Sequence, residues 1–253
     1  MKPVTPSILI ALTAVFLVSG AFAGEFESQA ASSRQSFEGQ WFPAEGVTNG
    51  IPAPSAPVEV RTKNQGPYYP GTNERSPEFG GPVDNFGLVI AGVYRGARVS
   101  KEEQFKYLKD NGINTLVNVS WPAKDNPELC AKYGFDCSYN AVKIVPGADL
   151  YFGMKDLKGA FDFTLDELKA GRKVYIHCHF GRERTGILAA ALMIRQNMCE
   201  PSRQADPQLK EKTWDLVEAS FKKFGYKMTY QKPFEEMKSW ITDFESNKAW
   251  LCR

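Results

Sequence analysis

Apolar residues between positions 85 and 245 follow two alternating patterns along the chain. Short continuous runs are typical of buried strands, and stripes spaced three or four residues apart are typical of helices that cover a sheet. Because stretches of the two kinds alternate, we predict an α/β fold with a central, mostly parallel twisted sheet of roughly four to five strands and helices on both faces. The strands are predicted at residues 88–90, 93–94, 113–119, 141–145 and 173–177.

The helical stripes are framed by helix-start and helix-stop residues. Ser100 and Glu103 form a capping-box pattern, and Gly112 ends the helix that follows. A second helix is predicted from Pro127 to Tyr133, directly before Gly134. Further stripes predict helices over residues 157–168, 187–194, 209–224 and 234–244, of which 187–194 is apolar on all sides and therefore central.

Two segments precede the predicted domain, which we expect to cover residues 85–253. Residues 1–23 have the features of a signal peptide, with a basic start at Lys2, an apolar run and the cleavage pattern Ala21-Phe22-Ala23. Residues 24–84 are rich in Ser, Gly, Pro, Asn and Gln, with scattered aromatic residues. This composition predicts an irregular arm that packs in part on the surface of the domain.

The apolar run of the leader is too short to span a membrane, and no later run reaches the roughly 18 residues needed. We therefore expect an exported protein without a stable membrane anchor, periplasmic or secreted after cleavage near Ala23. The formal net charge of +2 argues against broad electrostatic capture of nucleic acid or of membranes. The sequence indicates no oligomeric state.

Four of the five cysteines lie outside the segment that carries the candidate chemistry. In an oxidising compartment they can form two disulfides, for which we expect the pairs Cys130–Cys137 and Cys199–Cys252; the alternative is that some remain buried thiols. A metal site is not expected, because the chain has only two histidines and no Cys-x-x-Cys pattern.

The candidate chemistry lies in the run from His177 to Gly186, between a predicted strand and the central helix. Five residues separate Cys178 from Arg184, a spacing with which a loop can wrap around a tetrahedral oxyanion. The positive end of the following helix also favours thiolate over thiol. The planar guanidinium of Arg184 matches two phosphoryl oxygens.

This run resembles the His-Cys-x5-Arg-[Ser/Thr]-Gly signature of the protein-tyrosine-phosphatase superfamily, on its small dual-specificity side. Residues 85–96 and the order of the later elements also resemble these compact phosphatases. The resemblance implies that Cys178 attacks phosphorus to form a phosphocysteine, that Arg184 holds the oxygens, and that Thr185 helps the sulfur to leave. No cofactor is implied. The remaining loop residues would bind the phosphoryl group or support the loop: His179, Phe180, Gly181, Arg182, Glu183 and Gly186 as contacts, and His177 from beneath.

A general acid is needed to protonate the leaving oxygen. In this family it lies on a loop about thirty positions before the cysteine, and Asp149 lies 29 positions before Cys178, after a predicted strand and a Pro-Gly break. Asp156 is the main alternative, although we expect it to cap the next helix. Asp125 is also expected to cap a helix.

Two basic loop residues, His179 and Arg182, are typical of superfamily members that act on inositol phosphates. Together with the expected export, they make the phytase-like branch the nearest analogue. The enzymes of that branch remove phosphate from inositol hexakisphosphate. The sequence departs from that branch at the acid loop, which lacks its Asp-His-x-x-Pro pattern, and at Glu183, whose charge opposes a polyanion. Further phosphate contacts are expected from Arg95, Lys143 and Lys155.

Three other functions are compatible with parts of the pattern. A secreted protein tyrosine or dual-specificity phosphatase is the principal alternative, and ready cleavage of aryl phosphates would favour it. Sulfur transfer or arsenate reduction also uses a cysteine in an anion loop, but the complete signature argues against it. A phosphate-binding protein without turnover is the third, and the intact catalytic residues argue against it.

Overall fold

The computed structural model describes residues 68–69, 81–143, 151–227 and 231–253. Its main sheet has five strands in the order β2-β3-β6-β4-β5. Strand β2 is antiparallel to β3, and the other neighbouring pairs are parallel. This confirms the predicted mostly parallel α/β architecture. The strands are β2 (Gly87–Ile90), β3 (Val93–Ala97), β4 (Ile113–Asn118), β5 (Asp136–Tyr139) and β6 (Lys173–Cys178).

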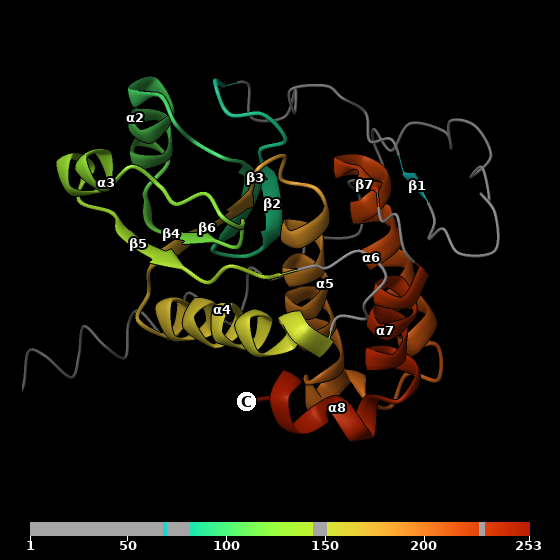
Figure 1. Cartoon of the computed structure of the whole chain (residues 1–253). Helices are drawn as coiled ribbons and strands as arrows, with labels where there is room; N and C mark the ends of the chain where they lie inside the picture. The colour runs from blue at the N-terminus through green and yellow to red at the C-terminus, as the bar shows by residue number, and fades with distance from the viewer. Residues whose placement is uncertain (1–67, 70–80, 144–150, 228–230) are drawn as a thin grey trace, which may run out of the picture. The chain divides into compact units, whose positions relative to one another are not determined.

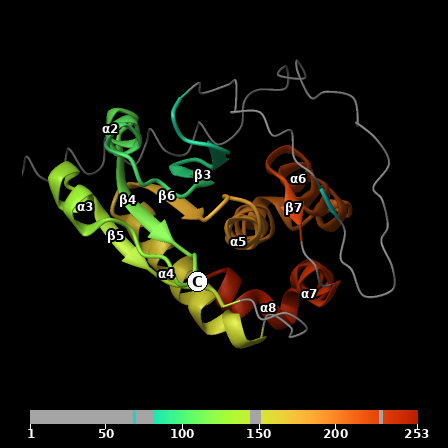
Figure 2. The ribbon, with the colours of Figure 1, turned by 45° about the horizontal axis from the view of Figure 1, so that its top comes forward.

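Helices cover both faces of this sheet (Figure 1; Figure 2). Helices α2 and α3 share one apolar core with the sheet, and α4 and α5 share the other. A separate two-stranded sheet pairs β1 (Tyr68–Tyr69) with β7 (Tyr226–Lys227) in antiparallel orientation. The helices of the described residues are α2 (Glu102–Asp110), α3 (Pro127–Tyr133), α4 (Tyr151–Lys169), α5 (Glu183–Met198), α6 (Leu209–Phe224), α7 (Gln231–Thr242) and α8 (Phe244–Leu251), with a short 3-10 turn at Pro201–Arg203. No helix in the described parts of the chain is long and apolar enough to cross a lipid bilayer.

Strand β6 lies at the centre of the sheet, and its side chains alternate between the two cores. Val174 and Ile176 are fully buried in the core that contains α4 and α5. Tyr175 is fully buried in the core that contains α2 and α3. Both neighbouring strands, β3 and β4, run parallel to β6. The strand is therefore fixed on every side before it delivers its last residue, Cys178.

Three predicted elements differ from the structure. The fifth strand is β5 (Asp136–Tyr139), whereas residues 141–143 form no strand and 144–145 lie outside the described residues. Helix α2 is capped one residue later than predicted, because the side chain of Gln104 accepts from the main-chain N–H groups of Ser100 and Lys101. In α6, which the apolar stripe of Leu209, Leu216, Phe221 and Phe224 predicts, Leu216 is 45% exposed, and its neighbour Val217 is buried instead.

The structure contains both expected disulfides, Cys130–Cys137 and Cys199–Cys252. The first joins α3 to β5, and the second joins the end of α5 to the chain end after α8. Cys178 is the free cysteine. The pairing keeps the four other sulfurs away from the reactive position.

Candidate active site

Cys178 is the last residue of the central strand β6, and α5 begins five residues later at Glu183. The cysteine is only 2% exposed. The loop between them, residues 179–182, therefore joins a buried strand end to the N-terminus of a long buried helix. A helix N-terminus presents unpaired N–H groups and the positive end of the helix dipole, which together favour an anion.

All four carbonyl groups of this loop accept hydrogen bonds from residues outside it. The carbonyl of His179 accepts from the main-chain N–H of Arg98 at 3.3 Å, and that of Phe180 accepts from Nδ2 of Asn85 at 3.0 Å. The carbonyls of Gly181 and Arg182 accept from the guanidinium of Arg95, at 2.8 and 3.3 Å. With its carbonyls bound by residues outside it, the loop has the polarity expected of an oxyanion nest, in which the amide N–H groups face the anion.

Gly181 is required for this loop by its backbone and by its surroundings. Its φ of +68° lies in the left-handed region that side chains disfavour. A Cβ at this position would lie 2.3 Å from the carbonyl carbon of Gly96, on the adjacent strand β3. The structure thus confirms the expectation that this glycine permits a special conformation, and it shows that close approach to β3 is a second reason.

Arg95 lies behind the loop, not on its open side. Its side chain is fully buried, its guanidinium lies 4.4 Å from the centre of the Phe224 ring, and Nη1 donates to the hydroxyl of Ser220 at 3.0 Å. Burial lowers the pKa of Arg95 to about 10, and the nearby Cys178 opposes this decrease. These contacts differ from the expected contact with substrate and instead give Arg95 the role of holding the loop carbonyls.

His177 is fully buried beneath the loop, as expected from the sequence. Its ring stacks on Tyr175 with centroids 5.4 Å apart, and Nε2 lies 3.2 Å from a carboxylate oxygen of Asp125. The hydroxyl of Tyr175 donates to the carbonyl of Ala97 at 2.5 Å. Burial raises the pKa of Tyr175 well above its ordinary value, so that this tyrosine remains a donor at neutral pH.

In the first turn of α5, Nε of Arg184 and Oγ1 of Thr185 are buried and have no hydrogen-bond partner among the described residues. Buried polar atoms are nearly always paired. An oxyanion held by the loop would supply acceptors at this place. Arg182, Glu183 and Gly186 belong to the same loop and first helical turn, and Gly186 donates its N–H to the carbonyl of Arg182 at 2.7 Å.

The three candidate acids have different positions. Asp149 lies outside the described residues. Asp156 does not cap α4, because the helix begins at Tyr151 and extends beyond it on both sides. Asp125 does not cap α3 either: the cap is Asn126, whose side chain accepts from the N–H groups of Glu128 and Leu129, while Asp125 pairs with His177.

The other cations expected to contact phosphate, His179, Lys143 and Lys155, have different surroundings. His179 is exposed and packs edge-on against Phe180, with ring centroids 4.4 Å apart. Lys143 is exposed, and its main chain lies against Gly153 of α4. Lys155 lines a cavity between α4, α7 and α8 whose lining includes Trp240 and Asn247 but no residue of the Cys178 loop.

Sequence reasoning missed the residues that hold the loop from a distance: Asn85, Arg98 and Asp125. Each lies between 52 and 95 positions before its partner, so no local spacing could reveal the contact. Asn85 has a φ of +56°, a conformation that asparagine tolerates better than most residues, but this becomes visible only in the structure. The described residues contain no group of three or more His, Cys, Asp or Glu side chains suited to a metal ion.

A cysteine at the buried end of a strand, a loop whose carbonyls are bound from outside and an arginine in the following helix are the arrangement expected of a cysteine-dependent phosphatase. Residues 90–198 match the family described as "Polymorphic toxin system, DSP-PTPase phosphatase". Over these residues the chain is therefore similar to dual-specificity phosphatases of the protein-tyrosine-phosphatase superfamily, in agreement with the resemblance of its signature run.

Several solved structures are similar to the chain at low sequence identity. The core catalytic domain of the PP-IP phosphatase SIW14 from S. cerevisiae, crystallised with citrate, is 20% identical; the match covers 67% of this chain and 96% of that one, with a TM-score of 0.45. PTPMT1 is 17% identical over 64% of this chain and 99% of its own, also with a TM-score of 0.45. A protein from Shewanella putrefaciens CN-32 described as "Putative phosphatase (DUF442)" is 18% identical over 56% of this chain and 95% of its own, with a TM-score of 0.37. No curated protein matches the sequence.

Proposed function

We propose that the protein is an exported phosphomonoesterase that acts through a phosphocysteine intermediate and hydrolyses inositol polyphosphates such as inositol hexakisphosphate. The observation that carries the proposal is the set of four loop carbonyls bound by residues outside the loop, because an oxyanion nest has this polarity, with its amides facing the anion. A phosphoryl group with several oxygens is the ligand that such a nest fits.

The proposed reaction has two steps. The thiolate of Cys178 attacks phosphorus, the bond from phosphorus to the leaving oxygen breaks, and a general acid, for which we propose Asp149, protonates that oxygen. Water then attacks the phosphocysteine, the S–P bond breaks, and the sulfur leaves as thiolate with help from the Thr185 hydroxyl. Arg184 and the loop amides stabilise the charge on the phosphoryl oxygens in both steps.

The proposed preference for a polyphosphate is based on the cations around the loop. His179 is exposed at the first position after Cys178, and Arg182 follows three positions later at the cap of α5. A second phosphate on the same small molecule needs a cation beside the one that holds the reacting phosphate. Exposed Lys143 is a further candidate, whereas Arg95, being buried, is not part of this contact set.

A second function, hydrolysis of phosphotyrosine in proteins, is favoured by aromatic residues at the same edge of the sheet. Phe180 is 61% exposed, Trp121 is 54% exposed and Tyr139 is 36% exposed, and they follow or end β6, β4 and β5. Contacts join these segments: Arg98 donates to the carbonyl of Lys124 at 2.7 Å, and the Lys124 ammonium lies 5.4 Å from the centre of the Tyr139 ring. An aromatic rim of this kind suits a substrate with an apolar or aromatic part.

The two functions are separated by measuring phosphate release from inositol hexakisphosphate and from a phosphotyrosine peptide, with the Cys178→Ser protein as the blank. His179→Gln should reduce the rate on the inositol phosphate several-fold more than the rate on the peptide, because it removes a polar contact outside the reacting phosphate. Phe180→Ala should have the opposite effect and reduce the rate on the peptide more than the rate on the inositol phosphate. Leu216→Ala is the matched control, since Leu216 is an exposed apolar residue on α6, outside the loop. Peptide hydrolysis without inositol phosphate hydrolysis would reject the proposed substrate class.

Export is the remaining part of the proposal. Two disulfides support it, because such bonds persist in oxidising compartments and are rare in a reducing cytosol. Expression of the full chain in a bacterium, followed by fractionation and N-terminal sequencing, tests this point. A protein that begins near Gly24 in the periplasmic fraction is the expected result, and an uncleaved protein in the cytosol would contradict it.

A further inference from the structure

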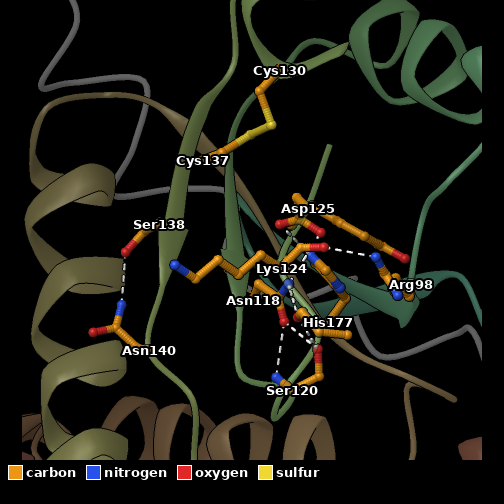
Figure 3. Close-up of polar contacts among 12 residues, drawn as sticks. Arg98, Asn118, Ser120, Lys124, Asp125, Cys130, Cys137, Ser138, Asn140 and His177 are labelled. Atoms are coloured by element: carbon orange, nitrogen blue, oxygen red, sulfur yellow. Dashed lines mark hydrogen bonds and ion pairs between the residues drawn. A yellow bond between two sulfur atoms is a disulfide. The ribbon is translucent and has the colours of Figure 1, made fainter. Parts of the chain in front are cut away.

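A chain of buried polar groups leads from the end of β4 to the residue that precedes the nucleophile (Figure 3). Asn118 is the last residue of β4, and Nδ2 of its side chain donates to Oδ1 of Asp125 at 3.1 Å. The other carboxylate oxygen, Oδ2, lies 3.2 Å from Nε2 of His177. The side chains of His177 and Asp125 are 0% and 4% exposed, so this pair is shielded from water.

The hydrogen-bond directions in this chain follow from one main-chain group. The N–H of Ser120 can only donate, and it donates to Oδ1 of Asn118 at 2.9 Å. The amide NH₂ of Asn118 must then face the opposite side, where it donates to the carbonyl of Ala123 at 3.0 Å and to Asp125. Because an ionised carboxylate only accepts, the remaining oxygen of Asp125 requires a hydrogen on Nε2 of His177.

The other ring nitrogen supports the same assignment. Nδ1 of His177 is buried and has no hydrogen-bond partner within the described part of the chain. A hydrogen on Nδ1 alone would leave a buried donor unpaired and would place the Nε2 lone pair against the carboxylate. A buried donor without a partner is unfavourable, so the arrangement selects the ring state with Nε2–H.

This chain is also tied to the loop that carries the nucleophile. Arg98 donates through its side chain to the carbonyl of Lys124, beside Asp125, and through its main-chain N–H to the carbonyl of His179, beside Cys178. The main chain of His177 is held between Gly96 of β3 and Asn118 of β4 by the sheet register. Residues 118–125 and the Cys178 loop are therefore connected at two separate points.

We infer that Asp125 is a positioning residue for the nucleophile: it fixes the orientation and the Nε2–H state of His177 and through it the geometry of Cys178. The inference rests on the proposed role of Cys178 as nucleophile and does not depend on which phosphate ester is the substrate. Asp125 itself does not touch the reacting atoms. Its oxygens are both used, one by Asn118 and one by His177.

Asp125→Asn is the sharpest substitution, because it keeps the size of the side chain and replaces one acceptor oxygen with a donor. Either orientation of the new amide sets a donor against a donor, toward Asn118 or toward His177. We expect kcat for p-nitrophenyl phosphate to fall about 10- to 100-fold, the scale of a small misplacement of a reacting group, with KM changed less than about threefold. Asp136→Asn, at an exposed aspartate in β5, is the matched control and should leave kcat unchanged.

Nitrogen-15 spectra of the histidine rings report which ring nitrogen carries the hydrogen, a property that a purely structural role of Asp125 would leave unchanged. The chain has only two histidines, and a His179→Gln background leaves His177 as the single signal. The parent protein should show a hydrogen on Nε2 of His177, and the Asp125→Asn protein should show a changed ring state. A hydrogen on Nδ1 alone in the parent protein overturns the inference, and this test remains valid if the variant does not fold.

A double substitution separates action through His177 from a general weakening of the fold. If Asp125 acts through the imidazole, adding Asp125→Asn to His177→Gln should reduce kcat no further than His177→Gln alone. Additive losses would overturn the inference. Failure of the proposed function is a different result, because it appears as absent turnover in the parent protein, whereas failure of the inference appears as parent turnover that Asp125→Asn leaves intact.

Discussion

The two faces of strand β6 bury different chemistry, although they belong to the same six residues. On one face, Val174 and Ile176 pack into an apolar core with α4 and α5. On the other face, Tyr175 and His177 are equally buried, but each makes a hydrogen bond to a partner near the end of a neighbouring strand. The apolar face stabilises the fold through packing, which has no preferred direction. The polar face makes directional hydrogen bonds near the end of the strand, where Cys178 lies.

This difference has a physical reason. Apolar burial is proportional to area and tolerates small shifts, whereas a buried hydrogen bond constrains distance and angle and is costly to leave unmade. A loop that must place amides and a sulfur around one phosphoryl group needs constraints of the second kind. The comparison therefore predicts that substitutions on the apolar face change stability and that those on the polar face change activity as well. Substitution of Cys178, the proposed nucleophile, should change activity alone.

The largest separation of activity from stability is expected for Cys178→Ser. The substitution removes the thiolate and alters only one atom, so turnover should fall by about 10⁴-fold or more, the scale on which a covalent nucleophile contributes. The thermal midpoint should stay within about 2 °C of the parent value. Phosphate release and a thermal melt measure the two effects. Residual turnover within tenfold of the parent rate would mean that another group is the nucleophile.

The apolar face is tested by Ile176→Ala. The side chain is fully buried, so its truncation should lower the free energy of unfolding by about 2–5 kcal/mol through lost burial and a residual cavity. Because Val174 and Ile176 make no polar contact with the loop, turnover per folded molecule should remain close to that of the parent. Chemical denaturation and active-site titration in the same sample provide both numbers. A loss of turnover larger than the unfolded fraction would break the distinction between the faces.

How far the sequence could predict the structure differs between these same regions. Helix α3 was predicted at Pro127–Tyr133, its observed bounds, because Pro127 and Gly134 mark its ends locally. The nucleophile loop was equally local, with Gly181 at the one position that requires a positive φ. Strand β5, Asp136-Cys137-Ser138-Tyr139, escaped prediction because an edge strand with polar residues lacks an apolar run. The residues that hold the loop were missed because Asn85, Arg98 and Asp125 reach it only through the fold.

A smaller effect on both quantities is expected for Tyr175→Phe, which removes one hydroxyl from the polar face. The carbonyl of Ala97 loses its donor, at a cost of about 1 kcal/mol in unfolding free energy. Because Ala97 precedes Arg98, whose N–H holds the loop at His179, kcat should fall about threefold to tenfold. Kinetics with p-nitrophenyl phosphate, compared with Tyr94→Phe as a control on the neighbouring strand β3, measure this effect. A stability loss with unchanged kcat would show that the polar face behaves like the apolar one.

The smallest effect concerns the pair of Glu167 and Arg172, which lies before the start of β6, at the opposite end of the strand from the loop, and should therefore change stability alone. Glu167, at the end of α4, accepts from the guanidinium of Arg172 and from the hydroxyl of Thr115. The hydrogen bonds from Arg172 hold the pKa of Glu167 below its ordinary value of 4.5, so the pair stabilises the fold above that pH and loses its contribution as the pH falls through the lowered value. Since Arg172 is half exposed, we expect Glu167→Gln to cost only about 1 kcal/mol at pH 7.

The test is the difference in thermal midpoint between the parent and Glu167→Gln proteins, measured from pH 7 down to pH 3. The difference should be constant at the upper end and shrink below pH 4.5, because the protonated parent then loses the same charge that the variant lacks. Glu211→Gln, at an exposed position of α6, should show a much smaller difference throughout. Turnover of the Glu167→Gln protein at pH 7 should match that of the parent. A reduced kcat would mean that buried polar contacts anywhere in this fold affect Cys178, and not only those at the strand ends beside the loop.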